Sequence, residues 1–234
     1  MVQDELVEIY RRMLEHFGPQ HWWPGETPFE VMVGAILTQN TNWQNVEKAI
    51  ANLRGRELLS LPAMAALSTE ELAEYIRPAG YYNIKAKRLQ NLFAMIAGHW
   101  ENDLDYLLQQ PAPVLREQLL SVKGIGPETA DSMVLYAAGH PMFVVDTYTH
   151  RILLRHEIIS EDADYFQIQE LFMDNLEEDT ALFNEYHALL VQVGKRFCKK
   201  SKPQCEECPL AGVGGVRKYL PCSRGGEMLR AVSI

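Results

Sequence analysis

The feature that most constrains the fold is a series of helix-start signals with no strand pairs between them. Residues 27–30 read TPFE, in which Thr27 can cap a helix, Pro28 suits its first position and the glutamate can return the capping bond. Similar boxes occur at residues 41–44 (TNWQ) and 68–71 (STEE). No alternating apolar runs are joined by Asn-Gly or Asp-Gly, so a sheet is not expected. The chain is therefore predicted to be all-α, with about ten helices joined by short loops.

Composition is that of an ordinary globular protein. Of the 234 residues, 47% are apolar and 23% are charged, which suits one large domain or two small ones. The apolar runs are too short for a membrane helix, which needs about 18 residues. The N-terminus lacks the basic start and apolar core of a signal peptide. We therefore expect a cytoplasmic protein that does not bind membranes.

The net charge of −9, from 22 Lys and Arg against 31 Asp and Glu, argues by itself against a nucleic-acid partner. The distribution of charge changes this interpretation. Residues 161–179 carry eight acids and no Lys or Arg, whereas residues 195–205 carry five Lys or Arg and no acid. A locally basic face is therefore expected in an acidic protein.

A tight turn at residues 122–127 (VKGIGP) separates two predicted short helices. The first helix would run through Leu115 and Leu119, and the second through Ala130 and Met133. Backbone N–H groups at the start of the second helix can bind a phosphate without any lysine. A plain corner between two helices, with glycine used only for the turn, explains the same residues equally well.

The turn resembles the helix-hairpin-helix of the endonuclease III superfamily of DNA glycosylases. Two further segments resemble that family at matching positions. Residues 144–151 (VVDTYTHR) are similar to its catalytic aspartate segment, and residues 37–41 (LTQNT) to its first buried helix with a DNA-probing glutamine. The resemblance spans roughly residues 20–222.

This resemblance implies two helical domains. Residues 27–140 would form a six-helix barrel domain that contains the helix-hairpin-helix. Residues 1–26 plus 141–234 would form a second helical domain with an iron–sulfur cluster loop at the C-terminus. A double-stranded DNA with a damaged base is the implied partner, and the protein is expected to be a monomer, associated with the nucleoid of a bacterium or archaeon.

Asp146 lies where an apolar stretch turns into a predicted helix, and a carboxylate there can simply be a cap. The resemblance instead implies that Asp146 projects into a cleft and is catalytic. It would stabilise positive charge on the sugar as the N-glycosidic bond breaks, or activate water.

The lysine of the bifunctional family members is missing. They attack the sugar with a Lys amine two residues after the second hairpin glycine, where this chain has Glu128. A carboxylate cannot form the Schiff base, so a monofunctional glycosylase without β-lyase activity is predicted. Glu128 itself is expected only to favour the helix dipole.

The resemblance also implies DNA contacts and an ion at the hairpin. Lys123 is expected to point toward DNA or solvent. Backbone carbonyls of Leu120, Val122 and Ile125 would surround K⁺ or Na⁺, with water as the alternative. The implied DNA-binding residues are Gln39, Lys123, Gly124, Ile125 and Gly126.

The aromatic residues narrow the resemblance to the 3-methyladenine DNA glycosylase III branch. Its base pocket is lined by a tryptophan, a proline and a further aromatic residue, which match Trp22, Trp23, Pro24 and Trp43 here. Such rings could stack on a flipped cationic purine, with roughly 0.5–2 kcal/mol of cation–π energy each. Sealing the core is an equally plain role for a tryptophan.

All four cysteines lie near the C-terminus: Cys198, Cys205, Cys208 and Cys222. Clustered thiols without a secretion signal favour a metal over disulfides. The first three match the family's iron–sulfur spacing, whereas Cys222 comes later than its pattern, and whether it is the fourth ligand stays open. A [4Fe-4S] cluster is expected, with Zn²⁺ as the alternative because thiolates bind both.

The predicted function is base-excision repair of alkylated purines such as 3-methyladenine, by hydrolysis of the N-glycosidic bond of a flipped nucleotide. Two alternatives remain: an endonuclease III-like glycosylase for oxidised or mismatched pyrimidines, and a non-catalytic DNA-binding relative. The preferred lesion, the preferred opposite base and any redox role of the cluster are not given by the sequence.

Overall fold

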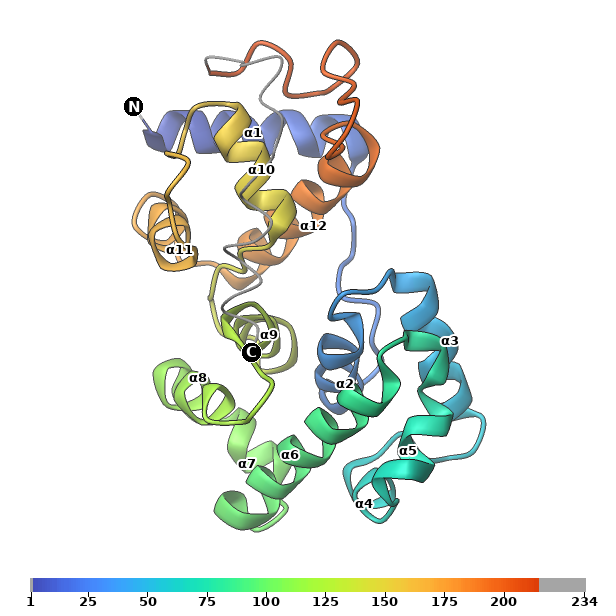
Figure 1. Ribbon diagram of the computed structural model, residues 1–234. Helices are drawn as coiled ribbons and strands as arrows, with labels where there is room; N and C mark the ends of the chain where they lie inside the picture. The colour runs from blue at the N-terminus through green and yellow to red at the C-terminus, as the bar shows by residue number, and fades with distance from the viewer. Residues whose placement is uncertain (1, 215–234) are drawn as a thin grey trace. The chain divides into compact units, whose positions relative to one another are not determined.

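The computed structural model describes residues 2–214, and its regular structure within that range is entirely helical, which confirms the all-α prediction (Figure 1). None of the helices in this range has the length and apolar character needed to cross a membrane. Two short segments, 3₁₀ and π-helical, are η1 (Arg77–Ala79) and η2 (Met133–Ala137). The α-helices are α1 (Val2–Phe17), α2 (Pro28–Thr38), α3 (Trp43–Arg54), α4 (Leu61–Ala65), α5 (Thr69–Tyr75), α6 (Tyr82–Trp100), α7 (Leu104–Leu108), α8 (Ala112–Leu120), α9 (Pro127–Ser132), α10 (Thr147–Arg155), α11 (Tyr165–Met173) and α12 (Thr180–Arg196).

The chain forms two compact units. Within the described residues, 23–140 make one unit, and residues 2–22 join residues 141–214 in the other. Trp23 packs against α2 of its own unit, because a Cβ atom at Gly34 would lie only 3.3 Å from its Nε1.

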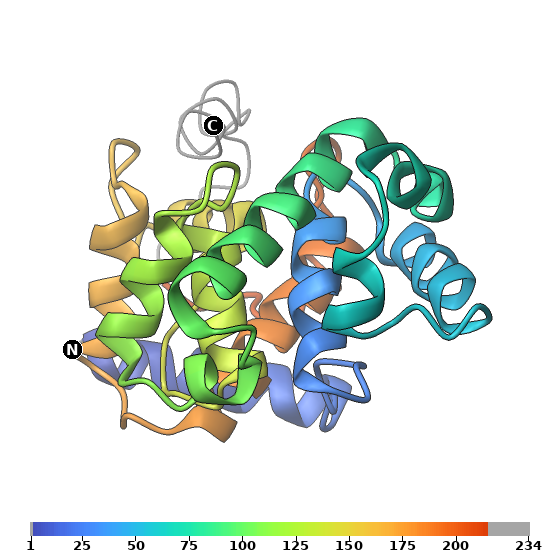
Figure 2. The same cartoon turned by 90° about the horizontal axis from the view of Figure 1, so that it is seen from below.

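Helix α2 forms the core of the 23–140 unit. All residues from Phe29 to Leu37 are buried, as the unbroken apolar run suggests. Thr27 caps the helix by accepting a hydrogen bond from Glu30 N at 3.2 Å, and proline occupies the first turn as expected. Helices α5 and α6 pack against each other in the same unit, and both views show them (Figures 1 and 2).

Two details of the expected caps were wrong. Helix α3 starts one residue later, because Asn42 rather than Thr41 is the N-cap and accepts from Asn45 N at 3.1 Å. Asparagine is at least as good an N-cap as threonine. Glu30 does not return a bond to Thr27, because its buried carboxylate forms an ion pair with Arg54 at 2.8 Å.

In the other unit, α12 is a mostly buried helix against which α1 and α10 pack. The phenol of Tyr186 donates to the Leu6 carbonyl at 2.9 Å and so ties α12 to α1. Gly194 of α12 lies against the Tyr148 ring of α10, where a Cβ atom would overlap the ring. Glycine therefore allows α10 and α12 to approach closely, which sets the position of the residue just before α10.

Candidate active site, hairpin and cysteine pocket

Asp146 is the N-cap of α10, so it has the capping role that its position in the sequence indicates. Its Oδ1 accepts hydrogen bonds from Thr149 N at 2.7 Å and from Thr149 Oγ1 at 2.9 Å. Both contacts use the same carboxylate oxygen. The residue is only 8% exposed, in contrast to most caps, which lie at the surface.

The second carboxylate oxygen faces a histidine of another helix. His187 Nε2 of α12 lies 3.8 Å from Asp146 Oδ2. Burial tends to raise the pKa of Asp146, but His187 and the Thr149 donors outweigh it, so the pKa lies below its ordinary value. The site therefore holds a buried, charged carboxylate, which is suited to stabilising a nearby positive charge.

The hairpin has the geometry that its glycines suggest. Gly124 has a φ of +99°, in the left-handed region that favours glycine, and Ile125 N donates to the Val122 carbonyl at 3.0 Å. Helix α9 begins after Gly126, and within residues 2–214 no side chain caps that end. Lys123 is exposed. One of the three carbonyls expected around a cation, that of Val122, thus already accepts a hydrogen bond.

Side chains from α2 and α6 hold the hairpin in place. Gln39 donates to the Gly124 carbonyl at 3.2 Å and to Thr129 Oγ1 at 2.9 Å, and it accepts a short hydrogen bond from Arg88. Asn91 donates to the Lys123 carbonyl at 2.9 Å. The glutamine expected to probe DNA therefore lies against the hairpin, at the C-terminal end of α2.

The aromatic residues are brought together in part. Trp23 and Trp43 are edge to face with ring centroids 5.1 Å apart, and Tyr136 lies 5.2 Å from Trp23. Pro24 is exposed and follows Trp23 directly. Trp22 belongs to the other unit. The 23–140 unit thus contains a three-ring aromatic cluster, defined as Trp23, Trp43 and Tyr136.

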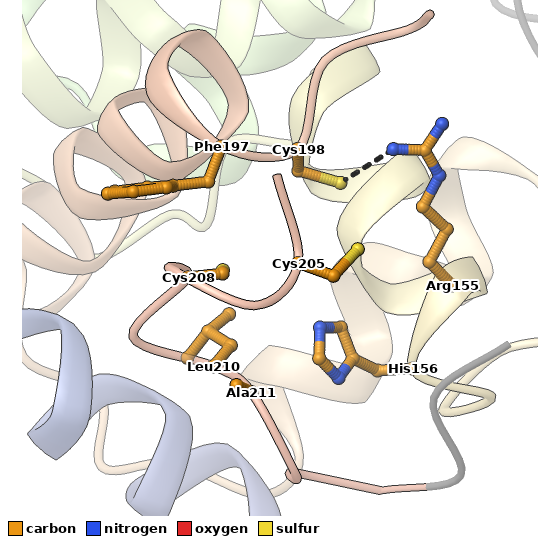
Figure 3. Close-up of a pocket in the computed structure, with 8 residues that line it drawn as sticks. All are labelled: Arg155, His156, Phe197, Cys198, Cys205, Cys208, Leu210 and Ala211. Carbon is orange, nitrogen blue, oxygen red and sulfur yellow. Dashed lines mark hydrogen bonds between the residues drawn. The ribbon is translucent and has the colours of Figure 1, made fainter. Parts of the chain in front are cut away.

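Three cysteines line one pocket, which Figure 3 shows with Phe197 and His156 at its wall. Cys198, Cys205 and Cys208 form no disulfide with one another. Arg155 Nη1 contacts Cys198 Sγ at 3.2 Å. Cys222, the fourth expected ligand, lies outside the described residues.

The donor set of this pocket fits a thiolate-bound metal. Soft thiolate sulfurs suit both an iron–sulfur cluster and Zn²⁺. Burial raises the pKa of Cys208 to about 11, so a metal would have to displace its proton on binding. Within residues 2–214, no three His, Cys, Asp or Glu side chains are grouped as a finished metal site. The three cysteines therefore line one pocket without being grouped as the ligands of a single metal ion.

Sequence reasoning missed three residues of these sites: His187, Tyr136 and Arg88. Each meets its partner only in the folded chain, since His187 lies 41 positions after Asp146 and Arg88 lies 49 positions after Gln39. His187 and Tyr136 lie within apolar runs, which are typical of residues in the hydrophobic core. No local spacing signal distinguishes them.

The sequence pattern of the HhH-GPD superfamily base excision DNA repair proteins matches residues 33–178. A protein of Methanocaldococcus jannaschii named as a DNA repair glycosylase is 46% identical over 206 residues, which cover 88% of this chain and 93% of the relative. Endonuclease III of Thermotoga maritima is 29% identical over 205 residues, covering 87% of this chain and 89% of the relative.

Solved structures are similar as well. A Helicobacter pylori 3-methyladenine DNA glycosylase bound to 1,N6-ethenoadenine superimposes with a TM-score of 0.72 and 30% identity, covering 83% of this chain and 97% of the other. A trapped covalent endonuclease III–DNA complex gives a TM-score of 0.77 at 23% identity, covering 98% of this chain and 100% of the other, and shares the fold.

Proposed function

Because the chain belongs to the HhH-GPD superfamily of base excision DNA repair proteins, we propose that it is a monofunctional glycosylase for alkylated purines. The general function, base excision repair as a DNA glycosylase, follows from membership of that superfamily. The substrate would be 3-methyladenine or a similar base, released from duplex DNA by hydrolysis of the N-glycosidic bond of a flipped nucleotide.

The observation that carries the choice of substrate is the aromatic cluster. Three rings within contact distance offer stacking surface, and stacking favours electron-poor, cationic bases. An alkylated purine of this kind leaves as a neutral base, so its bond breaks without strong acid catalysis. The similar H. pylori protein is named a 3-methyladenine DNA glycosylase and is bound to 1,N6-ethenoadenine, which supports a modified purine as the substrate. Pro24, which directly follows Trp23, is proposed to belong to this base pocket, and Trp22 stays a prediction from the sequence.

Asp146 is proposed as the catalytic residue. When the C1′–N bond breaks, the base takes the bonding electron pair and positive charge develops on the sugar. A buried carboxylate whose pKa is lowered remains ionised and can stabilise that charge. Water then adds to C1′ and loses a proton, leaving an abasic site.

DNA binding is proposed to use the hairpin. Backbone N–H groups at the start of α9 would bind a DNA phosphate. The hairpin residues Lys123, Gly124, Ile125 and Gly126 would lie along the DNA backbone. Gln39 would lie at the space that the flipped base leaves in the duplex. The carbonyls of Leu120, Val122 and Ile125 are proposed to bind a K⁺ or Na⁺ ion. The Val122 carbonyl would then contact the ion while it also accepts the hydrogen bond from Ile125 N.

The cysteine pocket is proposed to hold a [4Fe-4S] cluster, with Zn²⁺ as the alternative. Cys198, Cys205 and Cys208 would be ligands, and Cys222 the fourth. A bound cluster would supply structural cross-linking of the loop after α12. The neighbouring Lys195 and Arg196 are exposed and could then contact phosphate.

A glycosylase for oxidised or mismatched pyrimidines is the second candidate. The similarity to endonuclease III of T. maritima, over 87% of this chain, favours it. The absence of a lysine at position 128 argues against its lyase reaction but leaves base removal possible.

Base release from matched duplexes decides between the candidates. Wild-type protein should release 3-methyladenine from alkylated DNA and should release little or nothing from thymine glycol or G·T duplexes. The Asp146→Asn variant keeps shape but not charge, so it should bind abasic DNA normally and lose base release by at least about 100-fold. Release of thymine glycol without 3-methyladenine would establish the second candidate, and full turnover by the variant would remove Asp146 from the mechanism.

A further inference from the structure

Asp146 differs from the other aspartate caps of this protein. Asp103, Asp164 and Asp179 also accept a backbone N–H at the start of a helix, and all three are exposed. Asp146 is buried, and its Oδ2 faces the side chain of a different helix. A cap requires neither burial nor a histidine, because Oδ1 alone makes the capping bond.

The partner of Oδ2 is equally specific. His187 is 7% exposed, and Nε2 is the ring atom that faces the carboxylate at 3.8 Å. That separation is longer than a direct hydrogen bond, and it is within the distance of an ion pair when the ring is protonated. With a proton on Nε2, the ring presents a donor to Oδ2 while the two Thr149 donors hold Oδ1. The carboxylate is thus restrained from both ends.

We propose that His187 is a positioning residue for Asp146, whose Nε2–H fixes Oδ2 so that the carboxylate meets the sugar in one orientation. The proposal rests on the proposed function, in which Asp146 stabilises charge on the sugar. Restraint of a catalytic group in this manner reduces the reorganisation needed at the moment of reaction.

Other groups of α10 do not replace this role. Arg151 donates to the Cys198 carbonyl at 2.7 Å and lies over the Tyr148 ring at 5.0 Å. Its guanidinium is therefore held by groups other than Asp146. Burial and then the charge of Asp146 raise the pKa of Tyr148, so its phenol stays protonated at neutral pH. His187, on α12, makes the interactions that lower the pKa of Asp146 most.

Three substitutions test which atom of the ring matters. His187→Gln places an amide nitrogen near the reach of Nε2, His187→Asn places it one bond shorter, and His187→Phe keeps a ring without nitrogen. The exposed His99 serves as a control, as His99→Gln. Base release is measured in single turnover on alkylated duplex DNA with the full chain, beside abasic-DNA binding and thermal unfolding.

We expect the glutamine variant to retain base release within about 3-fold, and the asparagine and phenylalanine variants to lose roughly 10-fold or more. Abasic binding should be unchanged in all of them. Equal activity in the three variants, whether high or low, would overturn the proposal. A wild-type protein that releases no alkylated base, or an Asp146→Asn variant as active as wild type, would instead contradict the proposed function.

A second measurement does not depend on activity. Urea unfolding of wild type, Asp146→Asn, His187→Phe and the double variant gives the coupling between the two side chains. Coupling of at least about 3-fold in the unfolding equilibrium constant is expected for residues in direct contact. Additive effects would show that the two side chains do not act on each other, and the positioning role would then be wrong even if base release fell.

Discussion

At the scale of single residues, Glu128 is the residue from which we predict the absence of a lyase step after base release. It is exposed in the first turn of α9, where bifunctional relatives are implied to carry the attacking amine. Borohydride reduction with an abasic duplex should therefore yield no covalent adduct with the wild-type protein, because no Schiff base forms. Electrophoresis of the reduced mixture measures the adduct.

Glu128→Lys restores the amine and should give a trapped adduct, at a helix-dipole cost of about 0.3–1 kcal/mol. Lys123→Gln is the matched control, because Lys123 is the exposed amine within the hairpin. A wild-type adduct that disappears in this control would assign lyase chemistry to Lys123.

Trp43 tests the aromatic cluster as a binding surface. Trp43→Ala should reduce excision of 3-methyladenine by roughly 10-fold or more, from about 1–2 kcal/mol of lost stacking. Binding to an abasic duplex should scarcely change, because that DNA presents no base to stack. Loss of both to the same extent would mean that Trp43 only packs against Trp23.

Local conformation could be predicted from short motifs, whereas contacts between distant helices could not. Asp146 starts a helix and Gly124 has a positive φ, as their motifs indicate, and the functional roles that the family resemblance implies for them stay predictions. His187 and Arg88 act across contacts between helices far apart in the sequence. Their roles follow from which helices pack together, and nothing in their neighbours indicates it.

At the scale of elements, the hairpin turn depends on Gly124. A Cβ atom there would lie 2.5 Å from Arg88 Cγ, and the φ of +99° is unfavourable for any other residue. Gly124→Ala should lower the free energy of unfolding by about 1 kcal/mol or more and weaken binding to undamaged duplexes of any sequence. Urea unfolding and duplex titration measure the two effects.

Gly98→Ala is the control for this substitution. Gly98 lies in α6 with nothing within 4 Å of an added Cβ, so alanine there should be neutral or stabilising. Tight DNA binding by Gly124→Ala at wild-type level would show that the turn conformation is not needed for the phosphate contact.

Helix starts were predictable to within one residue because capping is a short-range interaction. The cap residues Thr27 and Ser68 act as expected, whereas α3 uses Asn42, since asparagine competes with the adjacent threonine for the same role. Glu30 escaped prediction for a different reason. Its partner Arg54 comes from another helix, and the Glu30–Arg54 ion pair is present in place of the local capping bond.

At the scale of the whole molecule, the C-terminal loop is expected to carry metal. Purified protein should be brown and contain iron and acid-labile sulfide, and Cys198→Ser or Cys208→Ser should lose both together with thermal stability. Ser201→Ala, in the same loop, is the control. Metal analysis and the visible spectrum decide the outcome.

A colourless protein with one zinc ion per chain would contradict the cluster assignment and favour the zinc alternative. Cys222→Ser addresses the fourth ligand separately. Unchanged metal content in that variant would require a fourth ligand from elsewhere in the chain.

The division of the chain into one continuous and one discontinuous unit has a consequence for its synthesis. Residues 23–140 are contiguous, so this unit has all its helices available as soon as they leave the ribosome. Helix α1 precedes the 23–140 unit along the chain, whereas its packing partner α12 follows it. Until α12 is made, the apolar face of α1, formed by Leu6, Ile9 and Met13, lacks this partner. The nascent chain thus carries this apolar face without its packing partner until α12 has been made.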